Sequence, residues 1–193
     1  TVAKMTMALE AENCDNILEI GCGSGYQAAI LAKVARRVFS VERIEALANS
    51  AKALMKNLSI NNVFIRFDDG NLGWRSYAPY DRIILSCFCQ NVPPKLFDQL
   101  RDGGILVAPV AKDGKQYITQ YKKSGNQIIC KTLDECVFVP LLDGTQRHGL
   151  LNHLNLMELR FGLMVIIFII LIVQTIMFLI NPRICGLKRH GLV

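Results

Sequence analysis

The feature that most constrains the fold is an apolar run, NILEI at 16–20, followed by three glycines at alternate positions, Gly21, Gly23 and Gly25. The next segment, YQAAILAKVA at 26–35, is rich in residues that favour helices. A buried strand joined to a helix by so short a turn is typical of α/β folds with a parallel sheet. Glycines in that turn would let the backbone adopt positive φ and approach a ligand closely.

The same alternation of strand and helix continues along the chain. We expect strands at 16–20, 37–42, 63–70, 81–86 and 105–110, and helices at 2–12, 26–35, 44–58 and 93–104. Three further strands, KQYITQYKK (115–123), QIICKTL (127–133) and CVFVPLL (136–142), are expected to be joined as hairpins. The pattern predicts an α/β fold with a mainly parallel sheet and an antiparallel C-terminal hairpin.

Acidic residues at strand ends indicate a nucleoside ligand. Glu42 ends the second strand, 21 residues after Gly21, where an acid can accept both ribose hydroxyls. Asp69 ends the third strand and is placed to meet an adenine. Tyr26 breaks the G-x-G-x-x-G pattern of nicotinamide sites, whereas G-x-G-x-G preceded by an acid, Glu19, is typical of S-adenosylmethionine sites. A tight turn with incidental glycines is the alternative.

Neither the charge nor the cysteine content of the chain indicates nucleic-acid binding or a metal site. Residues 1–144 carry 17 Lys and Arg against 15 Asp and Glu, whereas residues 145–193 carry five against one. The N-terminal part is nearly neutral, so its charge does not indicate nucleic-acid binding. Seven cysteines form no C-x-x-C pair, and no His cluster accompanies them. We expect free thiols in a reducing cytosol and no metal site.

Several motifs closely resemble those of bacterial protein-L-isoaspartate O-methyltransferases, continuously from about residue 1 to 144. They are TVAKMTMALE, ILEIGCGSGYQAAILAK, VFSVERIEALA, RFDDG, GW, YAPYDRIILS, LFDQLRDGGILVAPV and VFVPLLDG. The resemblance implies a Rossmann-like class I methyltransferase with a seven-stranded sheet. It implies that S-adenosylmethionine is the cofactor and that isoaspartyl residues of damaged proteins are the methyl acceptor. The positions carried over for the cofactor are Gly21, Gly23, Gly25, Glu42, Asp69 and Gly70, beside the acid Glu19.

The sequence contains no convincing pair of nucleophile and general base. The three histidines, His148, His153 and His190, lie outside the family-like region. An ionised carboxylate and a sulfonium methyl donor need orientation more than proton transfer, so this absence fits the reaction. The family's active-site serine belongs to a stretch of the type GQTISQP that would precede Thr1, so we name no catalytic residue and expect weak cofactor binding and low turnover. Phe88 is bulkier than the family's small residues there.

The C-terminal part differs from the family. Residues 161–180 contain only Gln174 and Thr175 as polar residues, and as a helix they would span about 30 Å, the thickness of the hydrocarbon core. We therefore expect a methyltransferase domain at 1–144, a linker at 145–160, a transmembrane helix at 161–180 and a basic tail at 181–193. The apolar segment is either a true anchor or the product of a frame change or gene fusion.

Localisation follows from the domain rather than from the tail. The positive charges after residue 180 would place the C-terminus in the cytoplasm, but the cofactor and the free cysteines place the domain there. We expect a monomeric cytoplasmic domain, tethered to the inner membrane if the helix is real. Two other functions stay open: a degenerate, membrane-tethered module that binds S-adenosylmethionine without catalysis, and another small class I methyltransferase.

Overall fold

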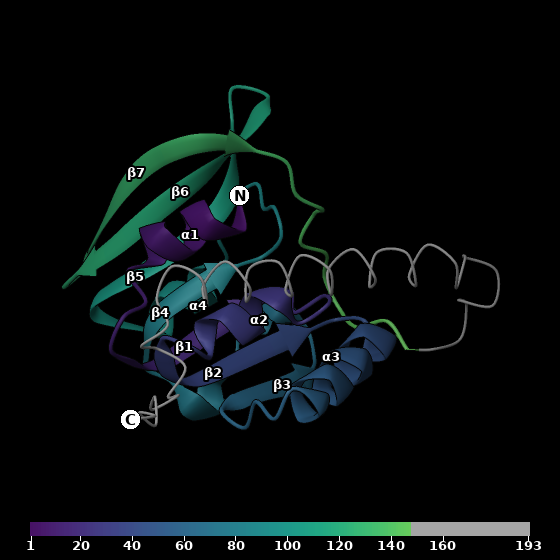
Figure 1. Cartoon of the computed structure of the whole chain (residues 1–193). Helices are drawn as coiled ribbons and strands as arrows, with labels where there is room; N and C mark the ends of the chain where they lie inside the picture. Colours follow the sequence, from purple (N-terminus) through teal and green to yellow (C-terminus); the bar gives the residue numbers. More distant parts are fainter. Residues whose placement is uncertain (148–193) are drawn as a thin grey trace, which may run out of the picture. The chain divides into compact units, whose positions relative to one another are not determined.

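The structure is a computed structural model, and it describes residues 1–147 of the chain (Figure 1). A seven-stranded sheet runs in the order β3-β2-β1-β4-β5-β6-β7. The strands are β1 (Cys14–Ile20), β2 (Ala35–Glu42), β3 (Val63–Phe67), β4 (Tyr80–Leu85), β5 (Leu100–Lys112), β6 (Lys115–Ser124) and β7 (Gln127–Cys136). Strands β1 to β5 are parallel, and β6 and β7 are antiparallel. The predicted α/β fold, the seven strands and the antiparallel hairpin are confirmed.

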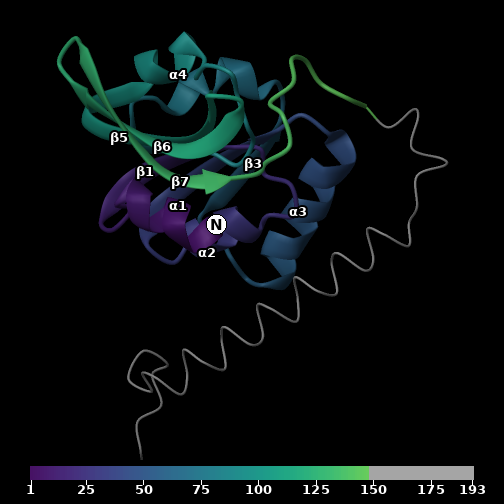
Figure 2. The same cartoon turned by 90° about the horizontal axis from the view of Figure 1, so that it is seen from above.

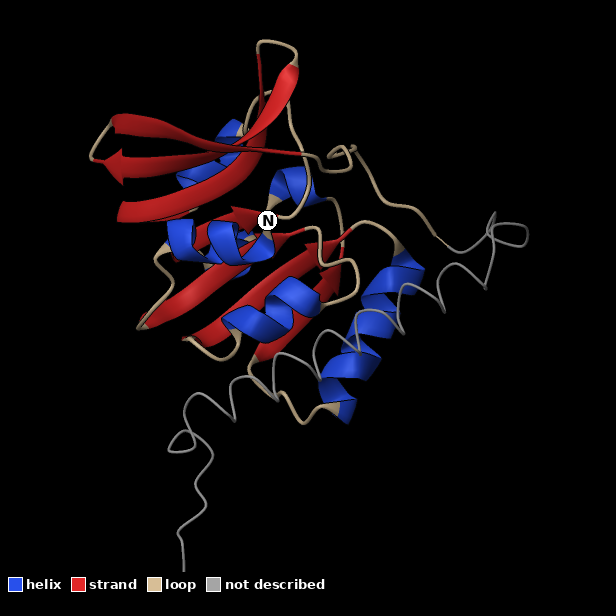
Figure 3. Cartoon of the chain, turned by 45° about the horizontal axis from the view of Figure 1, so that its top comes forward, coloured by secondary structure: helices blue, strands red, loops and turns tan. Residues whose placement is uncertain are grey.

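Helices cover both faces of the sheet. The helices are α1 (Val2–Leu9), α2 (Tyr26–Leu31), α3 (Glu45–Asn57) and α4 (Pro94–Asp98), with short 3-10 turns η1 (Gly70–Leu72) and η2 (Arg75–Tyr77). Helices α1, α2 and α3 lie on one face and α4 lies on the other (Figure 2). The long antiparallel strands extend the sheet at the end remote from α3 (Figure 3).

Successive side chains of the central strands pack on opposite faces of the sheet. In β1, Ile17 belongs to the core under α1 and α2, and its neighbour Leu18 belongs to the core under α4. Both side chains are fully buried. Because neighbouring side chains of a strand point to opposite faces, a parallel sheet covered on both faces needs an almost continuous apolar run. This requirement explains the composition of NILEI.

Several predicted elements end earlier in the structure. The predicted helix at 2–12 ends at Leu9, and the predicted strand at 63–70 ends at Phe67, so that Asp69 follows the strand. The predicted helix at 93–104 ends at Asp98, because Leu100 pairs with Tyr80 and begins β5. The predicted helix at 26–35 ends at Leu31, since Ala35 already pairs in β2.

A further difference concerns the predicted strand at 136–142, which leaves the sheet after Cys136. It forms only an isolated bridge, between Pro140 and Phe88. Val137 and Val139, 88% and 71% exposed, face solvent. Pairing ends here because Cys136 pairs with Gln116, and the partner strand β6 begins at Lys115.

No helix within residues 1–147 is both long and apolar enough to cross a membrane. The predicted transmembrane helix at 161–180 and the basic tail at 181–193 lie outside the described residues, as does almost all of the linker at 145–160.

Candidate cofactor site at the glycine turn

The glycine turn follows β1 at the carboxyl edge of the sheet and leads into α2. Gly21, Gly23 and Gly25 all have positive φ, of 87°, 54° and 82°. A Cβ at Gly25 would lie 2.8 Å from the Cε of Met55, so glycine also permits the close approach of α3. A Cβ at Gly23 would meet nothing within 4 Å. The space beside Gly23 is therefore open, as a cofactor that lies against the backbone requires.

Glu42, at the end of β2, holds this turn in place. Its side chain is only 5% exposed. Oε2 accepts the N–H of Gly23 at 2.8 Å, and Oε1 accepts the N–H of Ile44 at 2.9 Å. Each carboxylate oxygen has a further lone pair, so these bonds leave acceptor capacity for hydroxyl groups.

Glu19 lies on the floor of the site and is completely buried. The hydroxyl of Ser40 donates to its Oε2 at 2.5 Å, and the hydroxyl of Ser86 lies 3.4 Å from its Oε1. Burial raises the pKa of Glu19 to about 8, although both serine contacts oppose the rise. The carboxyl is therefore mainly protonated at neutral pH.

Asp69, after β3, binds other parts of the chain. Its Oδ1 accepts the N–H of Asn71 at 2.9 Å, and its Oδ2 accepts the N–H of Gly144 at 2.9 Å. Partial burial raises the pKa of Asp69, but these hydrogen bonds outweigh it and hold the pKa below its ordinary value. Asp69 is thus an ionised acceptor that fastens a distant segment to the site. A Cβ on the next residue, Gly70, would lie 2.5 Å from the Cγ2 of Ile20, so η1 packs closely on β1.

The structure brings all seven predicted site residues to the carboxyl ends of β1, β2 and β3. A cavity of about 210 Å³ lies at the glycine turn. Its lining includes Glu19, Gly21, Gly23, Ser86, Met5 and Phe138. Ligands of open α/β sheets bind at this edge, so the cavity is a candidate ligand site. The other four predicted site residues lie near it but do not line it: Gly25, Glu42, Asp69 and Gly70.

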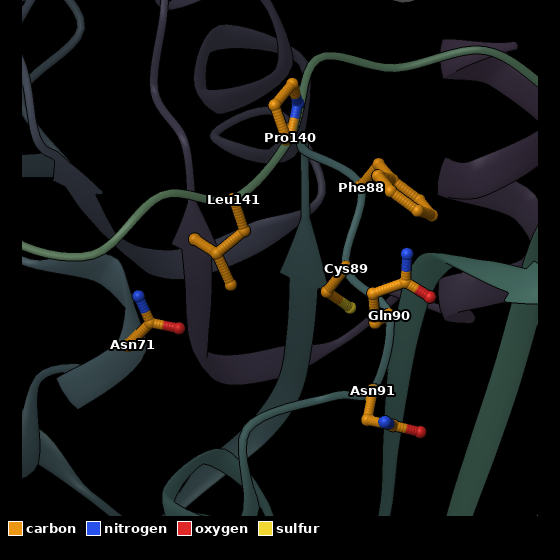
Figure 4. A pocket seen from close by; sticks show the side chains of 7 residues that line it. All are labelled: Asn71, Phe88, Cys89, Gln90, Asn91, Pro140 and Leu141. Carbon is orange, nitrogen blue, oxygen red and sulfur yellow. The ribbon is translucent and has the colours of Figure 1, made fainter.

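A second cavity, of about 460 Å³, lies beyond β4 (Figure 4). It is lined by Asn71, Phe88, Cys89, Gln90, Asn91, Pro140 and Leu141. Asn71 also donates from Nδ2 to Asp69 at 3.1 Å, which links this cavity to the cofactor site. The lining contains amides and apolar groups but no charged side chain. The bulky residue Phe88 is thus part of this lining.

Sequence reasoning missed the segment after β7 as a component of the site. Its Val139 carbonyl accepts the N–H of Phe88 at 2.8 Å, and the N–H of Leu141 donates to the Phe88 carbonyl at 2.6 Å. Further on, the N–H of Gln146 donates to the carbonyl of Arg43 at 2.7 Å. The segment thus runs along the carboxyl edge of the sheet, from Phe88 in the loop after β4 to Arg43 directly after β2. The motif VFVPLLDG was the only signal for it.

Other reactive groups do not gather into a second centre in the described part of the chain. Residues 1–147 contain no cluster of His, Cys, Asp and Glu that could hold a metal. Their cysteines are free thiols, and burial raises the pKa of Cys87 and Cys89 to about 12. His148, His153 and His190 lie outside the described residues.

The glycine turn, the acids at the ends of β1, β2 and β3, and the sheet order define a Rossmann-like methyltransferase fold. Solved structures agree with this class. A protein-L-isoaspartate O-methyltransferase superposes with a TM-score of 0.68 at 28% identity, over 72% of this chain and 45% of that chain. A protein of that description from Plasmodium falciparum, in complex with S-adenosyl-L-homocysteine, gives a TM-score of 0.61 at 22% identity, over 72% and 73%.

Sequence comparisons identify the family. The model of the protein-L-isoaspartate (D-aspartate) O-methyltransferase family matches residues 1–146, and the chain belongs to this family. The protein-L-isoaspartate O-methyltransferase of Helicobacter pylori strain G27 is 54% identical over 147 residues, which cover 76% of this chain and 70% of the relative. That of Maricaulis maris is 44% identical over 146 residues, covering 76% and 68%. The predicted family is confirmed, together with its enzyme class and S-adenosylmethionine as the family's cofactor.

Proposed function

We propose that this chain transfers the methyl group of S-adenosylmethionine to the free carboxyl group of L-isoaspartyl residues in damaged proteins. The main support for this proposal is the match of residues 1–146 to the protein-L-isoaspartate (D-aspartate) O-methyltransferase family. The site supports it, because the residues at the glycine turn leave a cavity against bare backbone and place acceptors around it.

We assign the cofactor to the residues at the three strand ends. The amino-acid end lies in the cavity at Gly21 and Gly23, with Gly25 at the end of the same turn, and Glu42 accepts the ribose hydroxyls. Asp69 and Gly70 border the adenine, and Asp69 is the ionised acceptor there. Oδ1 of Asp69 already accepts the N–H and the Nδ2 of Asn71, and Oδ2 accepts the N–H of Gly144, so Oδ2 keeps one lone pair for the base.

The reaction needs little proton transfer. S-Adenosylmethionine, when bound, supplies a methyl group already activated on a sulfonium. The isoaspartyl carboxyl has an ordinary pKa near 4 and is ionised at pH 7 without a general base. The residues of the site therefore work by holding the reactants in line and excluding water, which can contribute about 7–11 kcal/mol. The segment from Phe138 to Leu141, which contributes to both cavities, forms the wall on the acceptor side.

A methylation assay tests this function. The chain is incubated with S-adenosylmethionine and a peptide that contains one isoaspartyl residue, with the matching aspartyl peptide and a free dicarboxylic acid as controls. Methyl ester formation on the isoaspartyl peptide alone is expected. Equal methylation of the aspartyl peptide, or methylation of the free acid only, would contradict the assignment and indicate another class I methyltransferase.

We further propose the division predicted from the sequence: a monomeric cytoplasmic methyltransferase domain at 1–144, a linker at 145–160, a transmembrane helix at 161–180 and a basic tail at 181–193. The apolar composition of residues 161–180 supports the helix. Fractionation of cells that express the full chain tests this proposal. Recovery in the membrane fraction, resistant to high salt and released by detergent, is expected. Recovery in the soluble fraction would exclude the tether.

A further inference from the structure

Glu19 is a buried carboxyl group with no positively charged side chain beside it among residues 1–147. Its side chain is fully buried, and it lies among the residues that line the cavity at the glycine turn. Only one short hydrogen bond reaches it, from Ser40 at 2.5 Å, because the contact with Ser86 measures 3.4 Å. An ionised carboxylate needs a charge partner or several donors when it is removed from water.

The groups that face Glu19 do not supply such a partner. Glu42, on β2, is a second carboxylate, and its charge disfavours ionisation of Glu19. The thiols near it belong to Cys22, after β1, and Cys87, after β4, and burial raises the pKa of both. Helices α1 and α2 contribute Val2, Met5, Tyr26 and Gln27 to the lining of the cavity. Among the residues that the structure describes, the lining contains no Lys, Arg or His.

The ligand assigned to this cavity brings the missing charge. The amino-acid end of S-adenosylmethionine carries an ammonium and lies next to a sulfonium. A cation placed within a few ångströms of a buried carboxyl strongly favours its ionised form. The carboxyl of Glu19 is therefore protonated in the free protein and favours the ionised form in the complex.

We propose that the carboxyl of Glu19 releases its proton to solvent when the positively charged end of S-adenosylmethionine occupies the cavity at the glycine turn, so that cofactor binding is linked to pH through this residue. The inference rests on the proposed function, since it takes the cofactor from it. The carboxyl loses one proton on binding, and the nearby positive charge stabilises the resulting carboxylate. When the cofactor leaves, a proton from solvent returns to Glu19.

The linkage has a defined sign and range. Since burial raises the pKa of Glu19 to about 8 in the free protein, the carboxyl is protonated below that pH and must ionise on binding. Affinity for the cofactor then increases with pH, by up to about tenfold per pH unit. The ammonium of the cofactor has its own pKa near 8, so the useful interval is about pH 5.5–7.5.

Calorimetric titration of the full chain with S-adenosylmethionine tests the inference. The titration is run at pH 7.0 in two buffers with different ionisation enthalpies, and the difference in heat counts the protons released. We expect release approaching one proton per bound cofactor and a dissociation constant that falls between pH 5.5 and 7.5. Binding without proton release would overturn the inference and leave the proposed function intact. Failure to bind at all would overturn the function as well.

Two variants separate Glu19 from other carboxyl groups. Glu19→Gln keeps the shape and removes the proton, so the release and the pH dependence should disappear. Asp81→Asn is the matched control, because Asp81 is also buried but lies at the opposite edge of the sheet and pairs with Arg101. Proton release that persists in Glu19→Gln would overturn the inference. If that variant does not fold, the wild-type proton count decides alone.

A titration with S-adenosylhomocysteine identifies the cation that acts on Glu19. This product keeps the ammonium and lacks the sulfonium. Proton release with both ligands assigns the effect to the ammonium, and release with S-adenosylmethionine alone assigns it to the sulfonium. Both results support the inference, whereas absence of release with either ligand contradicts it.

Discussion

Replacement of Gly23 by alanine should damage cofactor binding far more than it damages folding. Gly23 has a φ of 54°, and a Cβ there would meet nothing within 4 Å. In the free protein the variant should therefore lose only about 1 kcal/mol of stability, the cost of a left-handed conformation for alanine. The new methyl group would project into the space that we assign to the cofactor, and overpacking of that kind costs about 1–3 kcal/mol. The dissociation constant should rise roughly 10- to 100-fold.

Gly125, in the turn between β6 and β7, provides a matched control. Its φ is 56°, and a Cβ there would also meet nothing within 4 Å. Gly23→Ala and Gly125→Ala should show similar midpoints in urea denaturation, and only Gly23→Ala should weaken S-adenosylmethionine binding in a calorimetric titration. Equal affinity of Gly23→Ala and the wild type would refute the reasoning, because the cofactor would then not lie against the turn.

Three further changes test the packing and the charges around the site. Gly70→Ala should destabilise the protein by about 1–3 kcal/mol, measured by denaturation, since its Cβ would lie 2.5 Å from Ile20; an unchanged midpoint would disprove this contact. Glu19→Gln should flatten the pH profile of stability. The folded protein holds the Glu19 proton between the ordinary pKa of 4.5 and about 8, so the wild type should lose as much as about 5 kcal/mol of stability as pH rises through that interval. The same slope in the variant would contradict the raised pKa of Glu19. Asp81→Ala should cost about 2 kcal/mol, because it leaves the Asn16 N–H and Arg101 without their acceptor; a loss below about 0.5 kcal/mol would contradict this role.

The sequence predicted those parts of the site that depend on local patterns. The turn from Gly21 to Gly25 was predictable because a strand, three glycines and a helix are consecutive in the chain. Glu42 and Asp69 could be placed because each follows an apolar strand, and the ends of parallel strands meet at one edge of the sheet.

Long-range contacts account for what the sequence could not predict. The alternation of CVFVPLL is typical of a strand, but it does not say which backbone will accept the segment; in the structure that partner is Phe88, far away in the chain. The end of α4 was misplaced for a similar reason, since pairing between Leu100 and Tyr80 decides where β5 begins. The raised pKa of Glu19 depends on burial, which only the assembled sheet provides.

The central claim is that the ends of β1, β2 and β3 hold S-adenosylmethionine, with Glu42 at the ribose. The most direct measurement is a calorimetric titration of the full chain with S-adenosylmethionine, repeated on Glu42→Ala and on Glu45→Ala, a control that changes an acid in the first turn of α3. The account predicts saturable binding at one site in the wild type, affinity at least about tenfold weaker in Glu42→Ala, which removes about 1.4 kcal/mol or more, and little change in Glu45→Ala. Binding to Glu42→Ala with wild-type affinity, or no binding to the wild type, would contradict it.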